Sequence, residues 1–342
     1  MASKKTSPKS SAKSYQSSGE NKTSAKAKAS AKTIKNFRPP FDENFSKALV
    51  QPKPKIDPQV AQAEKEAAQN LDAFAARPRK NFGQHWLRSE SVFQAIIKGS
   101  QLQPTDQILE IGPGTGNLTQ RMLPFVAQVV AVEVDWDLCA KLRQNFTQPN
   151  FTLIEGNVLE LPLPEGTNKV VANIPYNITG EILRKLLGTI AAPVTQFSQV
   201  VLLVQKEIAD RLISAPGHKA YNALSVRTQY LADCSLVCEV PPEAFFPKPK
   251  VTSAIVKICP RPPLVPVSNP QLMDRLLTMG FATRRKMLRN NLQPIIDRHD
   301  LIPLLESFGL NDTVRAEELS VSQWISLTEA VALRDQATTD NS

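Results

Sequence analysis

Four consecutive residues, Asn173-Ile174-Pro175-Tyr176, follow an apolar strand pattern and combine two hydrogen-bond acceptors with an aromatic ring. An exocyclic amine on a flat base is a poor nucleophile because its lone pair is delocalised into the ring. The Asn173 side-chain oxygen and the Ile174 carbonyl can accept its N–H protons, localise the lone pair and stabilise the charge that develops on nitrogen. Pro175 fixes the local backbone, and Tyr176 can stack on the base. The alternative is an ordinary strand-ending turn with a core tyrosine.

A glycine-rich turn precedes this tetrapeptide and predicts a site for a nucleotide-like cofactor. Gly112, Gly114 and Gly116 let the backbone bend sharply and approach a ligand without a Cβ in the way. The spacing is G-x-G-x-G, and Asn117 stands at the last position of the dinucleotide fingerprint G-x-G-x-x-G. A tight turn that binds nothing is the structural alternative.

Glu133 ends the next apolar strand, where a carboxylate can accept both ribose hydroxyl protons of a cofactor. NAD and S-adenosylmethionine both carry that ribose, so Glu133 does not separate them. A helix N-cap is the other role for Glu133 and for nearby Asp135. The glycine spacing and the lack of a plausible hydride-transfer histidine disfavour an NAD-dependent dehydrogenase. With the tetrapeptide, these residues favour methyl transfer from S-adenosylmethionine to an amino nitrogen of a nucleic-acid base.

Asn157 follows the third strand in Glu155-Gly156-Asn157, a position that faces the adenine of the cofactor in a fold of this kind. Its side-chain oxygen can accept a hydrogen bond from the adenine amino group. An asparagine that only makes a turn after a strand is the alternative.

The elements that must position these residues alternate along the chain. Near-continuous Val/Ile/Leu strands separated by helices predict an α/β fold with a parallel sheet covered on both faces. A helix over 89–99 with Ser89 as its cap comes first, and two later strands without an intervening helix are expected to pair on the same sheet. The expected strands are 107–111, 129–134, 151–154, 169–172, 200–204, 235–240 and 252–258, and the expected helices between them lie near 178–189 and 206–214.

The chain is predicted to have three parts. Residues 1–76 carry 14 Lys/Arg and 7 Asp/Glu and supply most of the net charge of +9. This Lys/Ser/Ala-rich segment buries too little apolar surface to order itself, and we expect a disordered basic tail and linker with one solvated helix at 58–76. The body at 77–262 holds the cofactor and catalytic motifs. Residues 263–342 show only helical leucine patterns and predict a small helical domain for docking on RNA or the ribosome.

Composition excludes several classes of protein. The four cysteines show no C-x-x-C pair and there are only three histidines, which argues against a metal site and for reduced cytosolic thiols. No apolar run approaches the ~20 residues needed to cross a membrane. We expect a cytoplasmic protein, with plastid import as the alternative because the N-terminus is Ser-rich and poor in acids.

The ordered motifs together resemble the ribosomal RNA adenine N6,N6-dimethyltransferases of the KsgA type over residues 77–330. The motifs are KNFGQHWL at 80–87, EIGPGTG at 110–116, VEVD at 132–135, NIPY at 173–176, VPP at 240–242, FFPKPKVTS at 245–253, FATRRKML at 281–288 and NNL at 290–292. The resemblance implies a class I (Rossmann-like) methyltransferase sheet with a small C-terminal all-helical domain. It implies transfer of two methyl groups from S-adenosylmethionine to each of two adjacent adenosines in a hairpin loop near the 3′ end of small-subunit (16S) rRNA. A role in 30S subunit biogenesis and a monomeric state are expected with it.

Site residues follow from the resemblance motif by motif. Phe245 is expected to form a second aromatic wall opposite Tyr176, which would offset the cost of extruding an adenine. His85 and Asn157 stand where the family commonly has Asn and Asp, and we expect Asn157→Asp to preserve activity or to tighten cofactor binding. The residues that the resemblance assigns to the cofactor pocket are His85, Leu87, Gly112, Glu133, Asn157 and Asn173.

A basic cluster in the C-terminal part is predicted to contact RNA phosphates from one helix start. It consists of Arg284, Arg285, Lys286 and Arg289. A solvated helix face is the plain alternative. Two other functions stay open: a related antibiotic-resistance methyltransferase that acts on large-subunit RNA, and a non-enzymatic ribosome assembly factor. The segments 245–253 and 281–292 favour the small-subunit enzyme over the first, and the intact tetrapeptide argues against loss of catalysis.

Overall fold

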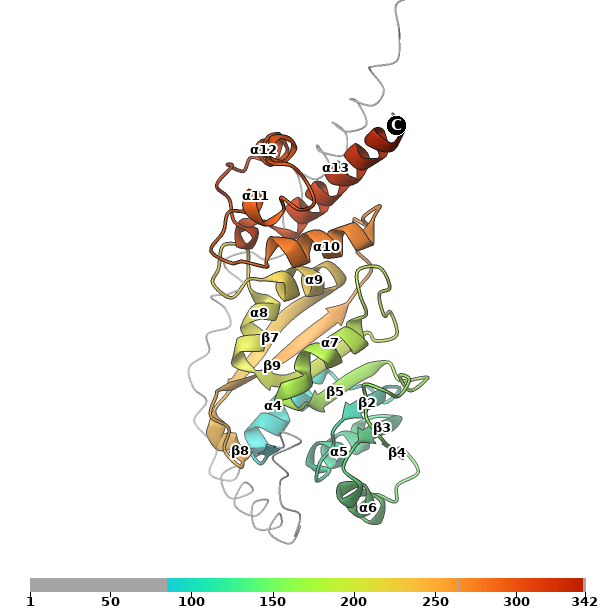
Figure 1. The fold of residues 1–342 in the computed structure, drawn as a ribbon. Coiled ribbons are helices and arrows are strands. Elements are labelled where there is room, and N and C mark those ends of the chain that lie inside the picture. The colour runs from blue at the N-terminus through green and yellow to red at the C-terminus, as the bar shows by residue number, and fades with distance from the viewer. Residues whose placement is uncertain (1–84, 264, 341–342) are drawn as a thin grey trace, which may run out of the picture. The chain divides into compact units, whose positions relative to one another are not determined.

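A computed structural model describes residues 85–263 and 265–340 (Figure 1). The expected disordered tail at 1–76, its helix at 58–76 and the motif residues before His85 lie outside these described residues. Within them, no helix is long and apolar enough to cross a membrane. The same residues contain no group of three or more acidic, histidine or cysteine side chains that could hold a metal ion.

A seven-stranded sheet forms the centre of the fold, in the order β4-β3-β2-β5-β6-β9-β7 (Figure 1). The five strands from β4 to β6 are parallel to one another, whereas β9 is antiparallel to both β6 and β7. The α/β sheet and the late antiparallel pair are confirmed. The strands are β2 Gln107–Ile111, β3 Gln128–Glu133, β4 Phe151–Glu155, β5 Lys169–Asn173, β6 Gln199–Gln205, β7 Ala232–Val240 and β9 Ser253–Pro260.

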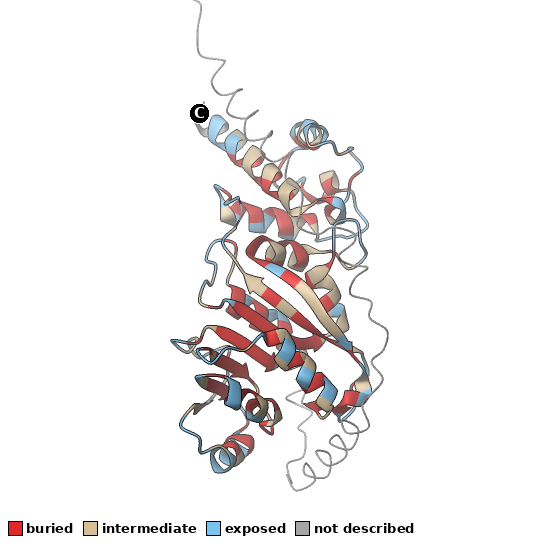
Figure 2. Cartoon of the chain, turned by 180° about the vertical axis from the view of Figure 1, so that it is seen from behind, coloured by how far each residue is buried: buried red, intermediate tan, exposed pale blue. Residues whose placement is uncertain are grey.

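The central strands are buried on both faces, which explains their continuous apolar sequences. Successive strand residues point to opposite faces: Val170 and Ala172 of β5 join one hydrophobic cluster, and Val171 joins the other. Figure 2 shows the strands buried between the helices. The helices of this part are α4 Glu90–Ser100, α5 Asn117–Met122, α6 Trp136–Asn145, α7 Thr179–Leu187, α8 Lys206–Ile213 and α9 Ala223–Leu231.

The expected helix at 89–99 is confirmed as α4, with Ser89 at the N-cap position. The Ser89 hydroxyl bonds to the Ser91 hydroxyl and makes no capping hydrogen bond to the backbone. Val92, Phe93 and Ile96 form its buried face, as the apolar spacing predicts. α5 and α9 were not predicted. The six-residue α5 is too short for a periodic apolar pattern. α9 runs directly into the edge strand β7, so no turn residue separates the two elements in the sequence.

The C-terminal part is helical, as expected, and contains α10 Pro270–Gly280, α11 Leu288–Asn291, α12 Arg298–Ser307 and α13 Val321–Asp340. Its central side chain is Trp324, which is fully buried and packs so closely on Gly280 that a Cβ there would lie 2.6 Å from the indole ring. Trp324 and Leu276 share one hydrophobic cluster with Val226 of α9 and Val200 of β6. The division into two domains at residue 262 therefore stays a prediction.

A separate two-stranded ribbon pairs β1 Trp86–Leu87 with β8 Phe245–Phe246. The pairing is antiparallel, with Trp86 opposite Phe246 and Leu87 opposite Phe245. Leu87 and Phe245 belong to the cluster that also contains α4 residues. The ribbon thus joins the beginning of the described chain to the segment that leads into β9.

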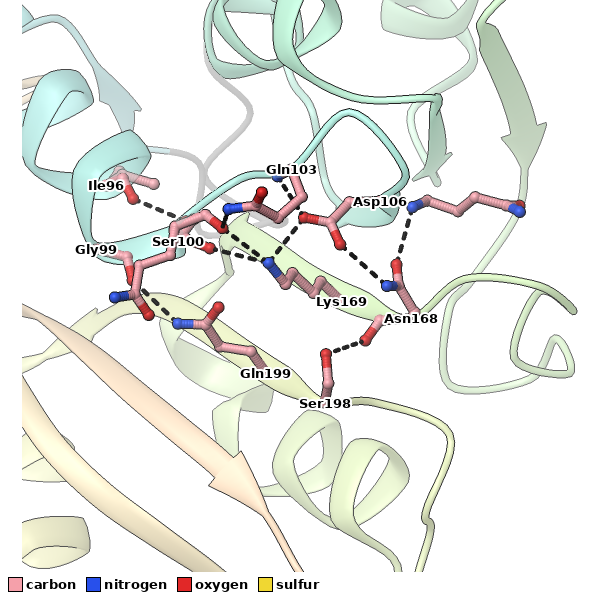
Figure 3. A network of polar contacts seen from close by, with 11 residues as sticks. Ile96, Gly99, Ser100, Gln103, Asp106, Asn168, Lys169, Ser198 and Gln199 are labelled. Atoms are coloured by element: carbon pink, nitrogen blue, oxygen red, sulfur yellow. Dashed lines mark hydrogen bonds and ion pairs between the residues drawn. The ribbon is translucent and has the colours of Figure 1, made fainter.

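The amino ends of the central strands carry a buried polar network, drawn in Figure 3. The Lys169 ammonium donates to Asp106 Oδ2 at 2.7 Å and to the Gln101 carbonyl, at the end of α4, at 2.9 Å. Asn168 links Asp106 Oδ1 to the backbone N–H of Gln107 at the start of β2. The network closes the edge of the sheet opposite to the carboxyl ends of the parallel strands.

Candidate active site

A cavity of about 250 Å³ opens at the carboxyl ends of β2 to β5, the edge at which open α/β sheets bind ligands. Parallel strands bring their last residues to this edge together, so residues far apart in the sequence meet there. The lining residues are His85, Trp86, Ile111, Gly112, Gly114, Val132, Glu133, Val134, Gly156, Asn157, Val158, Leu159, Asn173, Ile174, Pro175, Tyr176, Asn177 and Ile178. They include six of the eight predicted catalytic and cofactor residues.

The glycine turn forms one wall of the cavity. Gly112, Gly114 and Gly116 all have positive φ, which side chains rarely adopt. Gly116 also permits close packing, because a Cβ there would lie 2.3 Å from the Phe146 ring. Glycine is therefore required at this turn for conformation and for space.

Glu133 is 5% exposed and already bound to backbone groups around the cavity. Its Oε2 accepts from Gly114 N–H at 3.1 Å, and its Oε1 accepts from the N–H groups of Val134 and Asp135, each at 3.0 Å. Burial raises the pKa of Glu133 above its ordinary value, although these hydrogen bonds oppose the rise. The N-cap role belongs to Asp135, whose carboxylate accepts from Asp137 N–H.

Glu110, immediately before the turn, is a second buried carboxyl. It is 1% exposed and accepts a hydrogen bond from the Thr119 hydroxyl at 2.5 Å. Burial raises the pKa of Glu110 to about 8, with a further contribution from the nearby charge of Glu133. Glu110 itself does not line the cavity.

Asn157 lines the cavity, but its side chain also makes the local turn. Its amide donates to Glu160 Oε1 at 2.8 Å, and its Oδ1 accepts from Leu159 N–H at 3.0 Å. Contact with a cofactor adenine would use the second lone pair of Oδ1. Both roles suggested by the sequence are compatible with this geometry.

We expect the effect of Asn157→Asp on cofactor binding to depend on Glu160. The aspartate alone would face the Glu160 carboxylate without the amide donor that now separates them. In combination with Glu160→Gln, the aspartate regains a hydrogen-bond donor. The affinity of the double variant for S-adenosylhomocysteine should equal that of the wild type or exceed it by up to about tenfold. Calorimetric titration of the wild type and the two variants measures this, and clearly weaker binding by the double variant would contradict it.

Asn173 ends β5 with its amide held in one orientation. Its Nδ2 donates to the carbonyl of His85 at 3.2 Å. Because Nδ2 is used in this bond, Oδ1 is the atom of the amide that remains available as an acceptor. No residue in the described part of the chain donates a hydrogen bond to Oδ1. Asn173 therefore presents the acceptor that the proposed chemistry of an amine requires.

Tyr176 lies in the short helix η3 Tyr176–Ile178 and is fixed by its hydroxyl. The hydroxyl bonds to the Ser253 hydroxyl at 2.5 Å, and burial raises the pKa of Tyr176 above its ordinary value. The ring that faces Tyr176 is His85, with centroids 5.9 Å apart and planes inclined by 23°. His85 is itself anchored through Nδ1 to the Pro247 carbonyl at 2.7 Å.

The structure does not bring Leu87 and Phe245 into the cavity wall. Both are 4% exposed and pack in the cluster beneath the ribbon. The ring opposite Tyr176 is therefore that of His85 and not the expected ring of Phe245, because the pairing of β1 with β8 turns the Phe245 side chain toward the core. The roles of Leu87 and Phe245 stay predictions.

Several lining residues were missed by the sequence reasoning. Trp86, Val158 and Leu159 form apolar wall, and Ser253 fixes Tyr176 from β9. Ile111, Val132 and Val134 belong to the expected strands and to the quoted motifs, but a lining role was not predicted for them. Their positions beside Gly112 and Glu133 were the available signal, since residues at strand ends share the site with their neighbours.

The basic cluster is arranged differently from the prediction of one helix start. Arg284, Arg285 and Lys286 lie in the turn before α11, and only Arg289 is within that helix. Arg284 pairs with Glu317 at 2.7 Å and Arg289 pairs with Asp312. Arg285 and Lys286 are exposed and have no ion pair with another described residue, so they carry the uncompensated charge of the cluster.

Comparisons with known proteins agree with this arrangement. The model of the family "Ribosomal RNA adenine dimethylase" matches residues 75–333. The chain belongs to this family. It is 54% identical over 265 residues to "Ribosomal RNA small subunit methyltransferase A" of Acaryochloris marina, covering 75% of this chain and 97% of that protein. It is also 54% identical to the protein of the same name from Rippkaea orientalis, covering 73% and 96%.

Solved structures support the fold. A dimethyladenosine transferase from Plasmodium falciparum superposes with a TM-score of 0.61 at 24% identity, covering 71% of this chain and 96% of that one. The 23S rRNA methyltransferase ErmE superposes with a TM-score of 0.59 at 25% identity, covering 72% and 99%. The class I methyltransferase fold of this dimethylase family member is confirmed.

The cavity fits S-adenosylmethionine, the methyl donor of the family. The glycine turn leaves room for close approach, Glu133 offers carboxylate oxygens where a ribose would lie, and apolar side chains from Val132, Val134 and Val158 suit a purine. The residues proposed to hold the donor are His85, Gly112, Glu133, Asn157 and Asn173.

Proposed function

We propose that this chain transfers methyl groups from S-adenosylmethionine to N6 of two adjacent adenosines in a hairpin loop near the 3′ end of small-subunit (16S) rRNA, giving dimethyladenosines. Membership of the adenine dimethylase family supports the reaction class. The observation that carries the proposal is the Asn173 amide, whose nitrogen is tied to the His85 carbonyl so that its oxygen is available to an amine.

The residues of this chain act on the amine. Asn173 Oδ1 and the Ile174 carbonyl accept the N6 protons, which localises the nitrogen lone pair and stabilises the charge that develops on it. Tyr176, held by Ser253, presents its ring to the extruded base. When bound, S-adenosylmethionine supplies a methyl group on a positively charged sulfur. N6 would form its new bond to the methyl carbon as the bond from that carbon to sulfur breaks and S-adenosylhomocysteine leaves as a neutral thioether. The methylated amine would then lose its proton to water, so no side-chain base is needed.

Small-subunit RNA is favoured over large-subunit RNA as the substrate. The relatives named for the small subunit are 54% identical to this chain, whereas the 23S enzyme is 25% identical. We propose the 30S particle or its precursor as the partner, a monomeric enzyme, and an added role in subunit biogenesis. The proposed compartment is the cytoplasm, with the plastid as the alternative because the N-terminus is Ser-rich and poor in acids.

Undermethylated small subunits, purified protein and labelled S-adenosylmethionine test the proposed function. Nucleoside mass spectrometry should recover dimethyladenosine from two adjacent positions of small-subunit RNA. Large-subunit particles serve as the parallel substrate. Methyl transfer only to large-subunit RNA, or to no form of either RNA, would overturn the proposal.

The basic cluster should contribute to subunit binding mainly through Arg285 and Lys286, the two cations that form no ion pair with a described residue. We expect Arg285→Ala/Lys286→Ala to weaken binding to small subunits and to reduce the slope of log affinity against log salt by about 2. Arg284→Ala, which breaks the pair with Glu317, is the matched comparison and should change the slope less. Affinities measured over a salt series would refute this role if the double variant kept the wild-type slope.

A further inference from the structure

One face of the β1–β8 ribbon carries an exposed aromatic ring, Phe246, with the partly buried Arg88 stacked on it, next to the candidate active site. Leu87 and Phe245 point into the core, so alternation along each strand places Trp86 and Phe246 on the opposite face, together with Arg88. Phe246 is 46% exposed, and the Arg88 guanidinium carbon lies 4.1 Å from the centroid of its ring.

In the described part of the chain, no carboxylate forms an ion pair with Arg88, and its Nε is a buried donor without a hydrogen-bond partner there. Burying such a donor unsatisfied is costly. Lys250, four residues after Phe246, is exposed and likewise has no ion pair with a described residue. Lys248 between them is neutralised by Glu243. Arg88, which lies over the exposed Phe246 ring, and Lys250, which lies four residues after Phe246 in the chain, are thus two cations without an ion pair to a described residue.

The chain from Phe246 to Ser253 is bonded near both ends to residues that line the candidate site. The Pro247 carbonyl, next to Phe246, accepts from His85, whose ring faces Tyr176. Ser253, three residues after Lys250, bonds to the Tyr176 hydroxyl. Opposite Phe246 in the ribbon stands Trp86, which lines the cavity. A ligand on this surface would thus be continuous with a ligand in the catalytic pocket.

We propose that Arg88, Phe246 and Lys250 form a platform for a nucleotide of single-stranded RNA that flanks the target adenosine. The inference rests on the proposed function. Proteins hold unpaired bases by stacking on aromatic rings and guanidinium planes, with cations on the backbone phosphates. Here Phe246 with Arg88 supplies the stacking surface and Lys250 the phosphate contact. Holding the neighbouring nucleotide would keep the extruded adenosine from returning to its stack.

Binding of an unmodified RNA hairpin carrying the target adenosines, with S-adenosylhomocysteine present, tests the platform. Phe246→Ala should weaken RNA affinity about tenfold or more. Phe246→Leu should be similarly weak because it lacks a ring, whereas Phe246→Tyr should bind RNA about as tightly as the wild type. Lys250→Ala should lower the salt slope by about 1. Affinity for S-adenosylhomocysteine alone should be unchanged in all of these variants.

Matched controls are available on the same molecule. Phe125 is 53% exposed in η2 Leu123–Phe125, before the amino end of β3, and Lys98 is exposed in the last turn of α4. Phe125→Ala and Lys98→Ala should leave RNA affinity and its salt slope unchanged. Equal effects of Phe246→Ala and Phe125→Ala, or RNA affinity of Phe246→Ala within twofold of wild type, would overturn the platform.

Stacking itself can be followed by fluorescence. Two hairpins carry 2-aminopurine on the 5′ or the 3′ side of the target adenosines, and the base on the platform should be quenched by the wild type and less so by Phe246→Ala. If the quenching of 2-aminopurine fluorescence depends on Phe246 at neither position, the proposed platform is refuted. Methylation of the hairpin or of small subunits by the wild type is scored separately, so failure of the proposed function is distinguished from failure of the platform.

Discussion

Asn173→Ala should lower kcat for methyl transfer by about 10²–10³-fold, the loss typical of removing one preorganised group that stabilises charge in a transition state. The amide oxygen is the acceptor left available by the bond from Nδ2 to the His85 carbonyl. Because that acceptor acts on the amine as charge develops, the loss should appear in kcat more than in affinity for S-adenosylhomocysteine. Single-turnover methylation and calorimetric titration measure the two effects separately.

Asn177→Ala is the matched control, since Asn177 lines the same cavity but is exposed and lies beyond the tetrapeptide. Its loss of kcat should be below about tenfold. Tyr176→Phe keeps the ring and removes only the bond to Ser253, so it should retain more activity than Tyr176→Ala. Similar kcat values for Asn173→Ala and Asn177→Ala would refute the assigned role of Asn173.

Lys169→Met should destabilise the fold by about 3–5 kcal/mol, because it leaves the carboxylate of Asp106 buried without its cation. The side chains of Lys169 and Asp106 are only 10% and 5% exposed. The Lys169 ammonium also bonds to the Gln101 and Ser100 carbonyls at the end of α4, which lose their donor in the variant. Urea denaturation of the wild type and the variant measures the change in the free energy of unfolding.

The surface cluster of Lys206 with Asp210 and Glu239 provides the control. Lys206→Met should cost less than about 1 kcal/mol, since all three side chains are partly exposed. Asp106→Asn/Lys169→Met should recover part of the loss by removing the unpaired charge. Equal losses of unfolding free energy for Lys169→Met and Lys206→Met would show that the buried network stabilises the fold no more than surface ion pairs do.

The pH dependence of the same pair has a definite sign. Burial raises the pKa of Asp106, but hydrogen bonds from Lys169, Gln103 and Asn168 outweigh it, so the pKa lies below the ordinary value of 3.8. The stabilisation is therefore present above that value and is lost as the pH falls through the lowered pKa. In Lys169→Met the buried carboxyl becomes easier to protonate, so the stability gap to the wild type should narrow in acid.

The sequence was sufficient to predict the sheet and the strand ends that form the cavity. Glu133, Asn157 and Asn173 could be grouped because each follows an apolar strand, and the carboxyl ends of parallel strands meet at one edge. The buried Lys169 at the opposite edge had no such signal. A lysine before an apolar strand is normally exposed, and its partners Asp106 and Gln101 come from other elements.

Other features depend on contacts that periodicity does not encode. β1 and β8 have two residues each and are far apart in the chain, so neither their pairing nor the inward side of Phe245 could be predicted. Leu288 and Leu292 suggested a longer helix that would include Arg284. The helix α11 instead begins at Leu288 and ends at Asn291, three residues before Pro294.

The pairing of β1 with β8 also suggests a way to make the activity of the protein depend on an added peptide. A fragment that begins after Arg88 would retain every strand of the seven-stranded sheet, but it would lack the carbonyl that orients the Asn173 amide and the ring that faces Tyr176. Those groups sit on a few residues held largely by one short backbone pairing. A peptide supplied in trans could therefore complement the truncated chain and serve as an on-switch for RNA modification.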